Sequence, residues 1–124
     1  MTVRTKVWLE RDGRFVIGEG GLGLLEAIGH CGSLRAAAQR VGWSYRHAWG
    51  YLRNTERLVG ARLTQAVAGW GRARGTALTS DGEALGRWLA ALGRHAARST
   101  ATVPAGDPPG ALHRRVRSTD SRKT

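Results

Sequence analysis

The chain has 124 residues, of which 41% are hydrophobic, enough for one folded domain with a core of its own. Its formal net charge of +11 at pH 7 predicts an acidic polymer as its partner. The single cysteine, Cys31, excludes an internal disulfide and a cysteine-rich zinc site, and no apolar run is long enough to span a membrane.

The N-terminal segment predicts a small β-hairpin. Apolar and polar residues alternate over residues 3–10, as in a strand that is covered on one face. The covered side would carry Val3, Thr5, Val7 and Leu9. Asp12 and Gly13 then form the Asp-Gly pair typical of a tight hairpin turn, and residues 15–17 continue as the returning strand.

A glycine-rich segment follows the hairpin. Gly18, Gly20 and Gly23 form G-x-G-x-x-G between a strand and a helix, the spacing of a dinucleotide-binding loop. We reject that interpretation because such a site needs an acidic residue about 20 positions further on, and residues 27–55 contain no Asp or Glu. The glycines instead predict the start of a helix.

This helix covers residues 21–32, and its spacing predicts that Leu22, Leu25 and Ile28 lie in the core. Cys31 falls near its end. We expect Cys31 to act as a small buried apolar residue, and the alternative is that it acts as a redox sensor.

Two helices joined by a glycine turn are predicted in the middle of the chain. Ser33 is placed to cap a helix that ends before Gly42, and Ser44 to cap a longer one that ends before Gly60. A short helix, a glycine turn and a second helix with a polar front end form the helix-turn-helix pattern. In that motif the second helix lies in the DNA major groove.

The second helix of the pair has two different faces. The inward face carries Ala48, Leu52, Thr55 and Val59 at helical spacing. The other side carries Tyr45, Arg46, Trp49, Gly50 and Arg53, with His47 near the boundary. Either both aromatic side chains of the outer face contact DNA, or one of them packs inside the domain.

The positive charge is concentrated around this helix pair. Residues 33–75 contain eight arginines and one acidic residue, Glu56, whereas the charges of residues 1–32 balance to zero. Such a local excess is typical of a surface that binds phosphate, and the alternative is a solvated charged face.

A β-hairpin wing is predicted next. Two short extended segments, residues 62–67 and 76–78, flank a loop rich in glycine and arginine over residues 69–75. Arg72 and Arg74 would neutralise the DNA backbone or enter the minor groove, the alternative being a plain flexible turn.

The last predicted element is a helix that runs to about Arg98, with a capping box formed by Ser80 and Glu83. Its apolar stripe belongs either to the core or to a dimer interface. The stripe consists of Leu85, Trp88, Leu89 and Leu92. Residues 99–124 are basic and contain all three prolines, so we expect a disordered tail.

The order of hairpin, helix, helix-turn-helix, wing and helix predicts a winged helix-turn-helix domain over residues 1–98, mainly α with small β-hairpins. Over roughly residues 4–98 the chain resembles the DNA-binding domain of ModE-type molybdate-responsive regulators. The shared pattern G-S-x-x-x-A-A-x-x-x-G-x-S-Y-x-x-A-W is carried by Gly32, Ser33, Ala37, Ala38, Gly42, Ser44, Tyr45, Ala48 and Trp49. The family's L-T-x-x-G after the wing matches Leu78, Thr79 and Gly82. The more distant LysR-type regulators share this helix arrangement.

The resemblance implies binding of double-stranded DNA and a target near molybdenum genes. ModE proteins also carry a C-terminal oxyanion-binding domain, which we do not expect in this chain. No molybdate site, metal or other cofactor is therefore expected.

Our first hypothesis is a homodimeric, cytoplasmic, nucleoid-associated regulator of transcription on a palindromic operator. Its candidate DNA contacts are Ser33, Arg35, Ser44, Tyr45, Arg46, His47, Trp49, Arg53, Arg72 and Arg74. The alternatives are a non-specific architectural DNA binder and a protein-interaction module anchored by Trp70 and Trp88. An enzyme is not expected, because no metal-ligand spacing or nucleophile motif joins the polar residues.

Overall fold

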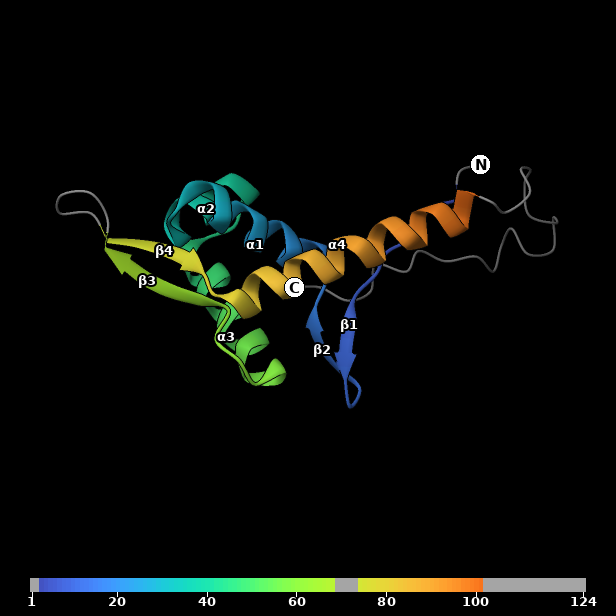
Figure 1. The fold of residues 1–124 in the computed structure, drawn as a ribbon, viewed down its shortest axis with the longest axis horizontal. Coiled ribbons are helices and arrows are strands. Elements are labelled where there is room, and N and C mark those ends of the chain that lie inside the picture. The colour runs from blue at the N-terminus through green and yellow to red at the C-terminus, as the bar shows by residue number, and fades with distance from the viewer. Residues whose placement is uncertain (1–2, 69–73, 102–124) are drawn as a thin grey trace.

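The computed structural model describes residues 3–68 and 74–101, and it has the predicted winged helix-turn-helix architecture (Figure 1). Four helices and two separate antiparallel hairpins follow one another along this part of the chain. They are β1 (Leu9–Arg11), β2 (Arg14–Ile17), α1 (Glu19–Cys31), α2 (Leu34–Val41), α3 (Tyr45–Val59), β3 (Thr64–Ala68), β4 (Arg74–Leu78) and α4 (Ser80–Ala101).

The core lies where α1, α2 and α3 meet. Leu25 and Ile28 of α1 are buried as predicted, Leu22 is half-buried, and Leu24 is also buried. Helices α2 and α3 contribute small side chains to this core, and these let the helix backbones approach closely. The buried alanines of α2 and α3 are Ala37, Ala38 and Ala48.

The N-terminal strand is shorter than predicted. Val3 and Thr5 are exposed, and pairing begins only at Leu9, where the register shifts before Glu10. The prediction of a strand from residue 3 is wrong because β2 has only four residues and offers the earlier residues no hydrogen-bonding partner. The turn is confirmed: Asp12 and Gly13 both have positive φ, 51° and 76°, as a tight hairpin of this type requires.

The glycine-rich segment accommodates a side chain of α3. The Gly18 amide donates to the Tyr51 hydroxyl at 3.0 Å, and a Cβ at position 21 would lie 2.5 Å from the Tyr51 ring. Burial raises the pKa of the Tyr51 hydroxyl above its ordinary value. The close approach of Ile17 and Tyr51 accounts for glycine at position 21.

Cys31 is the last residue of α1 and is half-buried, so it is more exposed than predicted. The Arg40 guanidinium of α2 lies 3.8 Å from its sulfur.

The cap of α4 is one residue earlier than predicted. Thr79, not Ser80, accepts from the Gly82 amide at 3.0 Å, and its hydroxyl also donates to the Arg62 carbonyl at 2.6 Å. The Thr79 amide donates to the Leu63 carbonyl at 2.9 Å. These contacts with the segment before β3 fix Thr79 as the residue that precedes the helix, so the predicted capping box at Ser80 is wrong.

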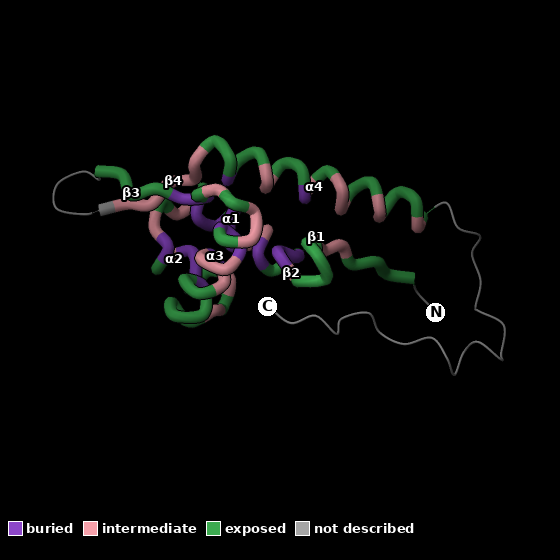
Figure 2. Tube along the Cα trace, turned by 90° about the horizontal axis from the view of Figure 1, so that it is seen from below, coloured by how far each residue is buried: buried purple, intermediate pink, exposed green. Residues whose placement is uncertain are grey.

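Helix α4 packs its first half against α1 and then continues away from the core (Figure 2). Leu89 is buried, Leu85 and Leu92 are half-buried, and Trp88 is exposed. The helix ends at Ala101, three residues beyond the predicted end, so residues 99–101 belong to it. The rest of the predicted tail, residues 102–124, lies outside the described residues.

Candidate nucleic-acid interface

The helix-turn-helix is formed by local capping contacts. The Ser33 hydroxyl accepts from the Ala36 amide at 3.0 Å, and the Ser44 hydroxyl accepts from the His47 amide at 3.0 Å. Gly42 and Gly60 end the two helices with left-handed φ values of 79° and 77°. All four predicted helix boundaries are therefore confirmed.

The inner face of α3 fixes the helix to the domain. Ala48, Leu52 and Thr55 are buried as predicted, and Val59 is half-buried. The Thr55 hydroxyl lies 2.8 Å from the Val16 carbonyl of β2, so a polar contact also joins α3 to the N-terminal hairpin. The opposite face of α3 points away from this core.

The outer face of α3 presents aromatic and basic side chains at its N-terminal end. Tyr45 is 42% exposed and Trp49 is 47% exposed, so neither of them packs inside the domain. Arg46 and His47 are exposed on the same turn. The Arg35 guanidinium of α2 lies 4.7 Å from the centre of the Tyr45 ring, which brings both helices of the motif to one surface.

His47 also contacts the turn between the two helices. Its ring lies edge-to-face with Trp43, with the ring centres 4.4 Å apart. Trp43 in turn packs against Tyr51, with the centres 5.1 Å apart. Trp43 thus packs the turn between the two helices against two aromatic side chains of α3, His47 and Tyr51.

Arg53 differs from Arg46 because it already has partners within the domain. It forms an ion pair with Glu56, three residues further along α3, and its guanidinium lies 5.5 Å from the centre of the Trp49 ring. Its side chain is 35% exposed. Arg53 therefore lies beneath the outer surface of α3 rather than extending freely from it.

The predicted wing is present as β3 and β4, which pair from Thr64 opposite Leu78 to Ala68 opposite Arg74. The Thr76 amide of β4 donates to the Gly32 carbonyl at 2.8 Å, so the wing is attached to the turn before α2. Arg74 is the first residue of β4. Arg72 and Trp70 lie outside the described residues.

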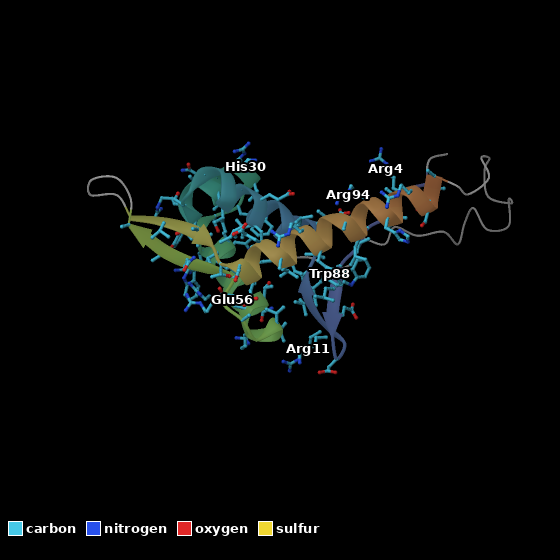
Figure 3. All side chains as sticks on the ribbon, in the orientation of Figure 1. Arg4, Arg11, His30, Glu56, Trp88 and Arg94 are labelled. Carbon is cyan, nitrogen blue, oxygen red and sulfur yellow. The ribbon has the colours of Figure 1, made fainter. Side chains whose placement is uncertain are left out.

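Sequence reasoning missed the role of Glu56, which is only 6% exposed. Figure 3 shows it where α3 meets the start of the wing. Its Oε2 accepts from the Leu63 amide at 2.8 Å and lies 3.5 Å from the Arg62 side chain. The signal that could have found it is its place beside the inward-facing Thr55, as the one acidic residue in a basic region.

Within residues 3–68 and 74–101, no three His, Cys, Asp or Glu side chains are grouped so that they could hold a metal ion. The helices of that same part of the chain include none with the length and apolar character needed to cross a membrane.

Parts of this chain are similar to known proteins. The family model for bacterial regulatory helix-turn-helix proteins of the lysR family matches residues 21–83. The molybdenum-pterin-binding protein MopB of Rhodobacter capsulatus is 40% identical over 79 residues, which cover 64% of this chain and 29% of MopB. The molybdenum transport protein ModE of Herbaspirillum seropedicae is 41% identical over 56 residues, which cover 45% of this chain and 21% of ModE.

This chain thus spans less than a third of the length of these two relatives. The crystal structure of ArgP from Mycobacterium tuberculosis is similar with 26% identity and a TM-score of 0.49, over 66% of this chain and 29% of ArgP.

The relatives confirm the resemblance to ModE-type domains. The segment that the family model matches extends from α1 to the first turn of α4 and includes the helix-turn-helix and the wing. The chain therefore belongs to the lysR family of bacterial regulatory helix-turn-helix proteins.

Proposed function

We propose that this chain binds a specific, palindromic operator as a homodimer and reads the major groove with the N-terminal half of α3. The observation that carries the proposal is the exposure of Tyr45, Arg46 and Trp49 just behind the Ser44 cap, on a helix whose other face is buried. Large exposed aromatic side chains gathered on one surface are typical of a binding site.

Each part of this surface has a chemical role in the proposal. The backbone amides at the start of α3, with Ser44, would bind a phosphate. Arg46 would donate to guanine O6 and N7, the commonest specific contact in the major groove. Tyr45 and Trp49 would contact thymine methyl groups or sugars. The side chains proposed to hold the DNA backbone are Ser33, Arg35, His47, Arg72 and Arg74.

The role of Arg53 is indirect in this scheme. Since Glu56 and Trp49 already hold its guanidinium, Arg53 would support the Trp49 ring at the DNA surface.

The proposed dimer forms through α4. Its 22 residues correspond to a length of about 33 Å at 1.5 Å per residue. Trp88 projects from it (Figure 3) and is 49% exposed. Leu85 and Leu92, three residues before and four residues after Trp88 on the helix, are half-buried. A second copy packed on this apolar surface would place two α3 helices about a two-fold axis, and a palindromic operator would match that symmetry.

The similarity to MopB, a molybdenum-pterin-binding protein, and to ModE, a molybdenum transport protein, supports a target near molybdenum-related genes. We assign no molybdate site to this chain. As a DNA-binding regulator it would act on the nucleoid in the cytoplasm.

A selection from random duplex DNA at near-physiological salt tests the proposal. We expect a two-fold symmetric motif with half-sites one helical turn apart, or about 34–36 Å. Tight binding without a motif would instead indicate an architectural DNA binder held by charge alone. Retention of no DNA would contradict both functions and leave a protein-interaction module.

A further inference from the structure

Glu56 joins two parts of the proposed DNA surface. One carboxylate oxygen, Oε1, pairs with the Arg53 guanidinium on α3. The other, Oε2, accepts from the Leu63 amide at 2.8 Å and from the Thr64 amide at 3.4 Å. The two oxygens of a single buried side chain therefore contact the helix on one side and the first residues of the wing on the other.

Each of these contacts leads to a DNA-facing element. On the helix side, Arg53 packs beneath the exposed Trp49 ring. On the wing side, Thr64 is the first residue of β3 and pairs with Leu78 of β4. Thr64 is itself buried, so the base of the wing is enclosed where the carboxylate reaches it.

At its start, the link between α3 and β3 is attached to the helix by its own backbone, because the Gly60 and Ala61 amides donate to the Glu56 carbonyl at 2.9 Å and 3.3 Å. This link comprises residues 60–63, and Gly60 has left-handed φ. The Leu63 carbonyl, which accepts from Thr79 and lies against Gly82, ties this link to α4. The Glu56 carboxylate attaches the far end of this link to α3, because it accepts from the Leu63 and Thr64 amides.

We propose that Glu56 is a positioning residue for DNA recognition, which holds the wing in register with the outer face of α3. The inference rests on the proposed function, in which α3 enters the major groove while the wing contacts the neighbouring backbone. A rigid domain makes both contacts at once. If the wing is released from α3, each contact must be ordered separately on binding, which weakens the complex.

Glu56→Gln tests this with almost no change in volume. A glutamine has a single acceptor oxygen, so it cannot accept from Arg53 on one side and from Leu63 on the other. The substitution also raises the net charge by one, which by itself strengthens binding to DNA. We expect the opposite, an affinity for the selected motif that is weaker by about tenfold.

The matched control is Glu83→Gln on α4. That side chain is 57% exposed and lies 3.9 Å from Arg87, so the variant makes the same charge change away from the junction. Its affinity should stay within about twofold of the wild type or increase. An affinity of Glu56→Gln that equals that of Glu83→Gln would overturn the inference.

A double-mutant cycle with Arg74→Ala separates positioning from a general loss of stability. In the wild type, removing Arg74 should weaken binding by about fivefold, whereas in the Glu56→Gln background the loss should be less than about twofold. Equal losses in the two backgrounds would show that Glu56 does not act through the wing. All affinities are measured at a temperature where thermal unfolding monitored by circular dichroism shows each variant to be folded.

Should Glu56→Gln not fold, Glu56→Asp tests the same contact with the charge retained. Its carboxylate is one methylene closer to the helix and cannot span both partners, so the same loss of affinity is expected. A wild-type chain that selects no motif would overturn the proposed function, and this inference with it. Specific binding by the wild type together with unchanged binding by the folded Glu56 variants would overturn this inference alone.

Discussion

Gly21 illustrates how a single residue in this domain is fixed by a distant part of the chain. A Cβ there would lie 2.5 Å from a carbon of the Ile17 side chain and 2.5 Å from the Tyr51 ring. Both neighbours are held in place, since Ile17 is buried and Tyr51 accepts from the Gly18 amide. Neither side chain can therefore move aside cheaply.

We predict that Gly21→Ala lowers the free energy of unfolding by about 1–3 kcal/mol through overpacking, although alanine is the better helix former. Gly50→Ala on α3 is the control, because a Cβ at that position meets nothing within 4 Å. It should raise the free energy of unfolding by about 0.5–1 kcal/mol. Urea denaturation of both variants measures the difference, and two changes of the same sign would contradict this explanation of Gly21.

At the residue scale, the sequence predicts what is decided by neighbours along the chain. Ser33 and Ser44 contact amides three residues ahead, and Gly42 needs only its own backbone conformation, so all three were predictable. The roles of Tyr51 and Glu56 depend on residues 33 and 7 positions away. The partners of these two residues can be identified only once the domain has folded.

At the scale of elements, the ends of strands and helices are decided by what lies beside them. Alternation predicted a strand from residue 3, but β2 is too short to pair with it. The start of α4 was misplaced for a similar reason. Ser80 and Glu83 form a plausible capping box in the sequence, yet the contacts of Thr79 with Arg62 and Leu63 select the earlier cap.

We predict that Thr79→Ala lowers the free energy of unfolding by about 1–2 kcal/mol, because it removes the cap of α4 and the contact with the Arg62 carbonyl. Ser80→Ala should change it by less than about 0.5 kcal/mol, as expected for an exposed residue that is not the cap. Thermal and urea unfolding of the two variants distinguish the positions. A larger effect at Ser80 than at Thr79 would contradict the assignment of Thr79 as the cap and support a capping box formed by Ser80 and Glu83.

At the scale of the whole molecule, the apolar surface of α4 is the proposed dimer interface. The first half of the helix packs on α1, whereas Trp88 remains exposed on a helix that continues beyond the core (Figure 1). The sequence left open whether this stripe belongs to the core or to an interface. Leu89 is buried in the core, and the interface remains a proposal.

We predict that the wild type sediments as a dimer and that Trp88→Glu sediments as a monomer, since a charge would then be buried at the contact. Ala97→Glu is the control. Ala97 lies nine residues beyond Trp88, on the opposite side of the helix, so this variant should leave the dimer intact. Sedimentation equilibrium measures both, and a monomeric wild type, or a dimeric Trp88→Glu variant, would contradict the proposed interface.

The central claim is that the outer face of α3 reads DNA sequence. Selection from random duplex DNA, carried out in parallel with the wild type and with Arg46→Ala, tests it most directly. Arg87→Ala is the control, because it removes the same charge from α4, where the side chain is 73% exposed.

We predict that Arg46→Ala loses the preference at one base pair of each half-site and weakens binding by about 1–3 kcal/mol, while Arg87→Ala keeps the full motif. An identical motif from the wild type and Arg46→Ala would contradict the role assigned to Arg46. A wild-type chain that binds DNA but selects no motif would contradict sequence reading by α3 altogether.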